Sequence, residues 1–148
     1  SVAVLRDGRV IQQATPSELY ERPADARLAR FLGSVNLLPA DFRDGQALTP
    51  LGTLPLRADT APGGGAGVVM VRPEQIAVRP RSDGERRPDE LDGRVEECRY
   101  YGHDAVLSIR PDAPAGVEVV LARVLPQHAL PTGTEVSLTA HGAVTALS

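Results

Sequence analysis

Turn residues interrupt the short apolar runs of this sequence at regular intervals. The chain has 13 prolines and 14 glycines among 148 residues. Glycine supplies the positive φ of tight turns and proline cannot donate to a strand ladder, so this pattern favours short strands joined by turns. Strands are predicted over residues 36–42, 47–49, 54–58, 68–72, 75–79, 91–101, 105–110, 117–124, 135–140 and 143–147. This spacing predicts a mainly β chain that forms a small barrel.

The first residues have a different organisation. Two apolar runs, residues 2–5 and 10–12, flank Asp7-Gly8, which is a strong signal for a hairpin. A helix is predicted to follow, with Thr15 as N-cap, Pro16 at its first position and Glu18 completing a capping box.

A second helix is predicted over residues 24–32, with Gly33 as its end. Its apolar residues Leu28, Phe31 and Leu32 fall on one face. We expect this face to be exposed in the chain taken by itself, and exposed apolar helices favour association. The sequence therefore predicts an oligomer.

These elements resemble the C-terminal edge of the ATP-binding subunit of ABC importers. The matching runs are Arg-Asp-Gly-Arg at 6–9, the Thr-Pro, Glu-Leu-Tyr and Arg-Pro pieces of 15–23, and Ala-Arg-Phe-Leu-Gly at 29–33. Asn-Leu-Leu-Pro at 36–39 and Val-Arg-Pro-Glu at 71–74 resemble the accessory TOBE (transport-associated OB) domain of that family. The resemblance implies a remnant of the ATP-binding domain over 1–34 and an OB-like TOBE barrel over 35–148.

The resemblance also implies a function. The chain would be a non-catalytic accessory and regulatory module that supports dimerisation of the ATPase subunit, with ATP and Mg bound elsewhere in the parent protein. Its partners would be a second copy of the subunit and the membrane permease subunits. It would lie in the cytoplasm at the inner face of the membrane. The imported solute would be ferric iron, a polyamine or a sugar, with ferric iron favoured; the alternative is a barrel that senses a small oxyanion.

The sequence argues against catalysis by this chain itself. A phosphate-binding P-loop ends in Lys-Ser/Thr, but all 16 basic residues here are arginine. The glycine-rich run at 63–67 is followed by Val-Val-Met and is predicted to belong to a loop spanning 60–67. No nucleophile, base and orienting group assemble in the sequence, so we predict no catalytic, nucleotide-binding or metal-binding residues.

Two segments are candidates for a regulatory or interface site. Arg72 and Glu74 flank Pro73, which marks a strand end, and the two could form a structural ion pair. Tyr101, Gly102 and His103 are predicted to form a turn between two strands, with Tyr101 packed on the barrel. A metal site at His103-Asp104 is the weaker interpretation, because neighbouring residues of a strand point to opposite faces.

Charge and cysteine content exclude further classes. The formal net charge is −3, and residues 35–148 carry 11 Arg against 15 acidic residues, whereas nucleic-acid binding needs a basic stripe. A solvated acidic surface is favoured over a site for a cationic ligand. The single cysteine, Cys98, excludes an internal disulfide and is predicted to be a buried structural thiol. No apolar run approaches the length of a membrane span.

Overall fold

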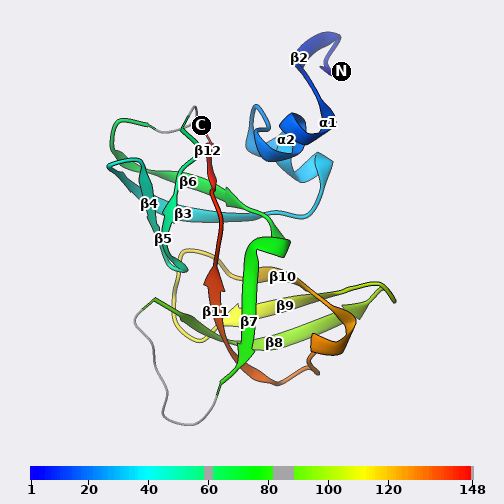
Figure 1. The fold of residues 1–148 in the computed structure, drawn as a ribbon, viewed down its shortest axis with the longest axis vertical. Coiled ribbons are helices and arrows are strands. Elements are labelled where there is room, and N and C mark those ends of the chain that lie inside the picture. Colours follow the sequence, from blue (N-terminus) through cyan, green and yellow to red (C-terminus); the bar gives the residue numbers. More distant parts are fainter. Residues whose placement is uncertain (59–61, 82–88, 148) are drawn as a thin grey trace.

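The computed structural model describes residues 1–58, 62–81 and 89–147. A small unit comes first, shown in blue in Figure 1. It consists of the hairpin β1 (Val2–Arg6) and β2 (Arg9–Ala14), followed by the helices α1 (Pro16–Glu21) and α2 (Ala26–Leu32). Asp7 and Gly8 take φ values of 51° and 77°, so the predicted hairpin turn is confirmed.

Both helices begin at well-formed caps. The Thr15 hydroxyl accepts from the Glu18 amide while the Glu18 carboxylate accepts from the Thr15 amide, which confirms the predicted capping box. The second helix begins at Ala26, two residues later than predicted, because the Asp25 carboxylate caps it by accepting from the Leu28 amide.

The remaining strands form two five-stranded sheets, which lie one above the other in Figure 1. The upper sheet has the order β12-β6-β3-β4-β5, made of β3 (Asn36–Arg43), β4 (Gln46–Thr49), β5 (Gly52–Pro55), β6 (Gly65–Val71) and β12 (Thr145–Leu147). The lower sheet has the order β10-β9-β8-β11-β7, made of β7 (Ile76–Pro80), β8 (Leu91–Tyr100), β9 (Ala105–Pro111), β10 (Val120–Val124) and β11 (Glu135–Ala140). Short 3-10 turns, η1 (Pro73–Gln75) and η2 (Pro126–His128), precede β7 and follow β10.

The chain passes between the sheets from β6 through η1 to β7, and returns from β11 to β12 (Figure 1). One hydrophobic cluster runs through both sheets, with Leu38 and Val69 contributed by the upper sheet and Leu107, Val136 and Leu138 by the lower. Aliphatic side chains therefore fill a continuous core, as a mainly β, OB-like chain with few aromatic residues requires.

Asn36 joins the two sheets without adding a strand. Its side-chain amide donates to the Leu121 carbonyl at 2.8 Å and accepts from the Leu121 amide at 2.7 Å. The side chain is 2 % exposed and takes the place of a neighbouring strand at the edge formed by β10. The backbone groups of Leu121, at this edge of the lower sheet, therefore have hydrogen-bond partners on β3.

The structure corrects several predicted boundaries. The loop expected over 60–67 ends early, because residues 65–67 belong to β6 and pair with residues 40–42 of β3. Gly67 allows β6 to pass beneath the ring of Phe42. A Cβ added at position 67 would lie only 2.6 Å from that ring. Strand β10 begins at Val120 rather than 117, and β12 at Thr145 rather than 143. Most of the charged loop predicted over 80–89 lies outside the described residues.

Candidate functional site

Arg72 lies where the N-terminal unit (residues 1–34) meets the sheets. It follows β6 directly and is 3 % exposed. One terminal nitrogen donates to the carbonyls of Ala29, Gly33 and Ser34, and the other to the carbonyl of Tyr20 at 2.8 Å. These carbonyls lie at the C-terminal ends of α1 and α2 or just beyond, where the helix dipole favours a cation. One guanidinium therefore holds both helices against the end of β6.

Tyr20 completes this contact. The Arg72 guanidinium carbon lies 3.9 Å from the centre of the Tyr20 ring, and the Tyr20 hydroxyl donates to Glu74 at 2.7 Å. Burial and the hydrogen bond to Glu74 raise the pKa of Tyr20 to about 12. Burial lowers the pKa of Arg72, while Tyr20 and Glu74 act in the opposite direction. The predicted ion pair between Arg72 and Glu74 is not formed among the described contacts; the two side chains are linked through Tyr20 instead.

Strand β12 makes a second connection to α1. The Thr145 hydroxyl donates to the Glu21 carbonyl at 2.6 Å and accepts from Nε of Arg57 at 3.1 Å. The side-chain amide of Gln75 donates to the carbonyls of His141 and Ala143, and these bonds fix the segment that leads into β12. We call these contacts, together with those of Arg72, Tyr20 and Glu74, the joint.

A pocket of about 270 Å³ opens beside the joint. Tyr20 and Glu21 of α1 line it, together with Glu74 and His141. Met70 and Thr145, both 2 % exposed, also line it. Its walls therefore come from the N-terminal unit and from the sheets, and they carry both signs of charge.

The other three predicted site residues lie elsewhere. Tyr101, Gly102 and His103 form the turn between β8 and β9, as predicted: the Tyr101 amide donates to the Asp104 carbonyl, and Gly102 has φ 87°. Tyr101 does not pack on the barrel, since it is 54 % exposed. The imidazole of His103 is 82 % exposed and lies 3.5 Å from the Asp104 carboxylate. The structure brings Arg72 and Glu74 together through Tyr20, but it does not bring this turn to them.

The N-terminal unit presents an apolar face. Phe31 is 80 %, Leu5 68 % and Val10 57 % exposed. A groove of about 180 Å³ runs between the hairpin and α2 and is lined by Leu5, Leu28 and Phe31 among others. The expectation that Leu28 is exposed is wrong, because only 1 % of this residue is exposed. Leu32 is half-buried. Phe31 accounts for the exposure at this end of the helix.

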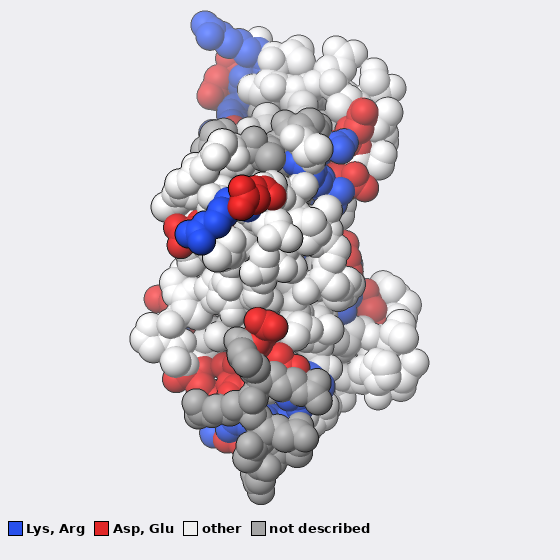
Figure 2. Space-filling view, turned by 60° about the vertical axis from the view of Figure 1, so that its left-hand side comes forward, with Lys and Arg blue, Asp and Glu red and all other residues white. Residues whose placement is uncertain are grey.

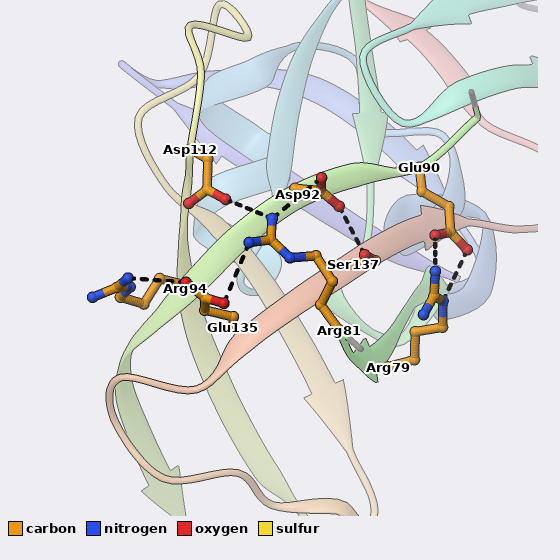
Figure 3. A network of polar contacts seen from close by, with 8 residues as sticks. All are labelled: Arg79, Arg81, Glu90, Asp92, Arg94, Asp112, Glu135 and Ser137. Carbon is orange, nitrogen blue, oxygen red and sulfur yellow. Dashed lines mark hydrogen bonds and ion pairs between the residues drawn. The ribbon is translucent and has the colours of Figure 1, made fainter. Parts of the chain in front are cut away.

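A polar network links residues in, or directly after, the strands β7, β8, β9 and β11 of the lower sheet (Figure 3). Arg81 contacts the carboxylates of Asp92, Asp112 and Glu135, and Glu135 also contacts Arg94. Figure 3 shows the Arg81 guanidinium between these carboxylates, with the Arg79–Glu90 pair to one side. Every charge drawn there has an opposite charge next to it, so the arrangement fits a structural role.

The surface charges show no large field of one sign on the described part of the face in Figure 2, where basic and acidic side chains are interspersed. Among residues 1–58, 62–81 and 89–147, no three His, Cys, Asp or Glu side chains are grouped to hold a metal ion. Cys98 is half-buried against the core rather than fully buried as predicted. In the same ranges no helix has the length and apolar character to cross a bilayer.

The sequence of this chain also matches a known protein family. Residues 69–147, which hold the second half of the joint and the lower sheet, match the TOBE domain family, and the chain belongs to that family. The cytoplasmic molybdate-binding protein ModG has a similar fold, with a TM-score of 0.57 over 76 % of this chain and 96 % of that one, at 14 % identity. The OB-like fold predicted from the sequence is thereby confirmed.

The sequence relatives are ATP-binding subunits of importers, as the motifs predicted. A Fe(3+) ions import ATP-binding protein of Pseudomonas fluorescens is 38 % identical over 93 % of this chain and 38 % of its own length. A sulfate/thiosulfate import ATP-binding protein of Chromobacterium violaceum is 33 % identical over 84 % of this chain and 33 % of its own. The chain thus spans well under half the length of these relatives.

Sequence reasoning missed three residues of the joint and its surroundings. Tyr20 and Asn36 stood in recognised motifs but had no assigned contact, and Thr145 carried no signal beyond being polar. All three make contacts between residues far apart in the chain. A polar side chain within an apolar strand, as at Thr145, was the available hint that a buried partner exists.

Proposed function

We propose that this chain is the non-catalytic accessory module of an importer's ATP-binding subunit, and that it regulates the subunit through the joint. The observation that carries the proposal is the buried Arg72 guanidinium, which binds carbonyls at the ends of both helices. A change in the sheets that moves Arg72 must move α1 and α2 with it. This gives a physical route by which the state of the barrel biases the orientation of the N-terminal unit.

We further propose the division into residues 1–34, a part of the ATP-binding domain, and residues 35–148, the TOBE-like barrel. The apolar face at Leu5, Val10 and Phe31 supports this, because isolated globular domains rarely leave such large side chains together in water. In the complete subunit this face would lie against the ATP-binding body. The joint would connect that body to the barrel.

In the complete protein, ATP and Mg would bind to residues outside this chain, and hydrolysis would drive import. The subunit would pair with a second copy and with membrane permease subunits at the inner face of the membrane. The iron importer relative supports ferric iron as the solute. The other relatives include sulfate/thiosulfate and spermidine/putrescine import subunits, so an anion or a polyamine is the competing proposal.

The test compares the complete subunit with a version that lacks residues 35–148. We expect the shortened protein to hydrolyse ATP but to dimerise more weakly, seen by light scattering, and to lose the dependence of its rate on the permease. Unchanged dimerisation and unchanged regulation would refute the accessory role. A rise in melting temperature on adding molybdate or sulfate to residues 1–148 would favour the oxyanion-sensing alternative.

A further inference from the structure

The two five-stranded sheets share one topology. In each sheet three successive strands form a meander, the next strand returns to pair with the first of them, and a fifth strand pairs with that one. The upper sheet builds this pattern from β3, β4, β5, β6 and β12, and the lower sheet from β8, β9, β10, β11 and β7, with each of these pairs antiparallel. Along the chain, however, β7 follows β6 and β12 follows β11 (Figure 1). The two sheets therefore exchange their fifth strands.

The two connections that make this exchange are short. Strand β6 ends at residue 71 and β7 begins at residue 76, while β11 ends at 140 and β12 begins at 145, so both connections have four residues. We call them the first crossing (residues 72–75) and the second crossing (residues 141–144). Connections of this length leave little slack. A separation of the two sheets would therefore strip β7 from β11 or β12 from β6.

Gln75 fastens the two crossings to each other. Its side-chain nitrogen donates to the carbonyls of His141 at 3.0 Å and Ala143 at 2.9 Å, and its own carbonyl accepts from the His141 amide at 2.9 Å. Its side-chain oxygen accepts from the amide of Arg72 at 3.1 Å. One half-buried side chain in the first crossing thus sets the position of the second.

The end of α1 is bound to both crossings at once. A terminal nitrogen of Arg72, the first residue of the first crossing, donates to the Tyr20 carbonyl at 2.8 Å. The hydroxyl of Thr145, which directly follows the second crossing, donates to the next carbonyl, that of Glu21, at 2.6 Å. These two carbonyls are the last of α1. The distance between the two donors therefore determines how the end of α1 is held.

We propose that the crossings form a conformational device in which Gln75 is the positioning residue: it keeps the two crossings in register, and their register sets the position of α1. The hydrogen bonds given above for Gln75 stay within the crossings, so its effect on α1 passes through Arg72 and Thr145. The device deepens the proposed function and rests on it for its regulatory meaning. A shift of one sheet against the other changes the register and so moves α1 on the side of the ATP-binding domain.

The test is native-state hydrogen exchange on this chain with Gln75→Met, which keeps a side chain of similar length and removes its donors and its acceptor. We expect amides of α1, β7 and β12 to exchange about tenfold faster, because the side-chain bonds between the crossings are lost. Gln127→Met is the matched control, since Gln127 is exposed in the other 3-10 turn, η2, and should leave the exchange of α1 unchanged.

A second variant separates the donors of Gln75 from its acceptor. Gln75→Glu keeps an acceptor for the Arg72 amide but places a carboxylate against the carbonyls of the second crossing, so it should also speed the exchange of α1 about tenfold. It serves as the test if Gln75→Met does not fold. Unchanged exchange of α1 in these variants, even with faster exchange of β7 and β12, would overturn the proposal, because Gln75 would then act only on its own surroundings.

Nuclear magnetic resonance of ring-labelled tyrosine supplies a second readout. The chain has 3 tyrosines, and the ring of Tyr20 lies against Arg72, whereas Tyr100 and Tyr101 are at the turn after β8. The Tyr20 signal should shift in both Gln75 variants and not in Gln127→Met; an unmoved Tyr20 signal would contradict the proposal. These results do not bear on whether the complete subunit needs residues 35–148, so failure here is distinguishable from failure of the proposed function.

Discussion

Replacing Arg72 by methionine should release the N-terminal unit from the sheets. Methionine keeps most of the apolar stem and removes the guanidinium. One terminal nitrogen shares three carbonyls, at 3.1, 3.2 and 3.4 Å, and the other binds the Tyr20 carbonyl at 2.8 Å. We count these as about three effective hydrogen bonds of about 1 kcal/mol each.

Loss of the stacking on Tyr20 adds about 1 kcal/mol to this cost. The variant no longer buries the unpaired Nε, which lowers the cost by about 1 kcal/mol. The expected net loss is therefore about 3 kcal/mol, concentrated in the contact between α1, α2 and β6. Because about 1.4 kcal/mol corresponds to a factor of ten, protected amides of both helices should exchange on the order of 100 times faster.

The assay is native-state hydrogen exchange read by mass spectrometry, with Arg30→Met as the matched control on the exposed side of α2. The control should change exchange little, since exposed substitutions away from special contacts fall within about 0.5 kcal/mol. Amides of the lower sheet should be nearly unaffected in both variants. Equal protection of α1 and α2 in Arg72→Met and Arg30→Met would show that Arg72 does not hold the helices.

Three further changes test other parts of the structure. Asn36→Ala should destabilise the chain by about 2 kcal/mol in urea unfolding, because it leaves both backbone groups of the residue it bonds on β10 without partners; no loss would show that water replaces the amide. Gly93→Ala should cost about 2 kcal/mol, because the new Cβ would lie 2.8 Å from a backbone oxygen of β9, whereas Gly63→Ala meets nothing within 4 Å and should be nearly neutral; equal effects would contradict this. The side chain of Arg6 donates to Asp25 and, with a backbone N–H, lowers the pKa of that carboxyl from 3.8 to about 2. A lowered pKa in the folded chain stabilises it above the unfolded value, so this contribution should be complete above about pH 4 and lost as the pH falls toward 2. Asp25→Asn should remove that part of the acid dependence, measured by urea unfolding from pH 2 to 6, and an unchanged pH profile would contradict it.

Local chemistry made much of the fold predictable. The Asp7-Gly8 turn and the capping box at Thr15 and Glu18 depend on residues close in sequence, and they formed as expected. The division into two sheets was not predictable from the strand count, because it depends on which strands pair over long distances. The start of β6 was misplaced for the same reason: glycines that suit a loop also suit a strand that must pass beneath Phe42.

The candidate site was predictable in part. Arg72 and Glu74 stood out beside Pro73, but their partner Tyr20 is more than fifty positions earlier in the chain. An ion pair was the natural expectation for two opposite charges close in sequence. The structure instead places the guanidinium against helix-end carbonyls, which become available only when the two helices dock. Contacts of this kind follow from tertiary arrangement and leave no periodic signal in the sequence.

We propose above that this chain is part of an importer's ATP-binding subunit. The most direct measurement is the coding sequence immediately upstream of Ser1 in the source DNA. We expect, in the same reading frame and within about one domain length, a glycine-rich loop ending in Lys-Ser/Thr, followed by an apolar strand that ends in Asp-Glu. A start codon directly before Ser1 would contradict this membership.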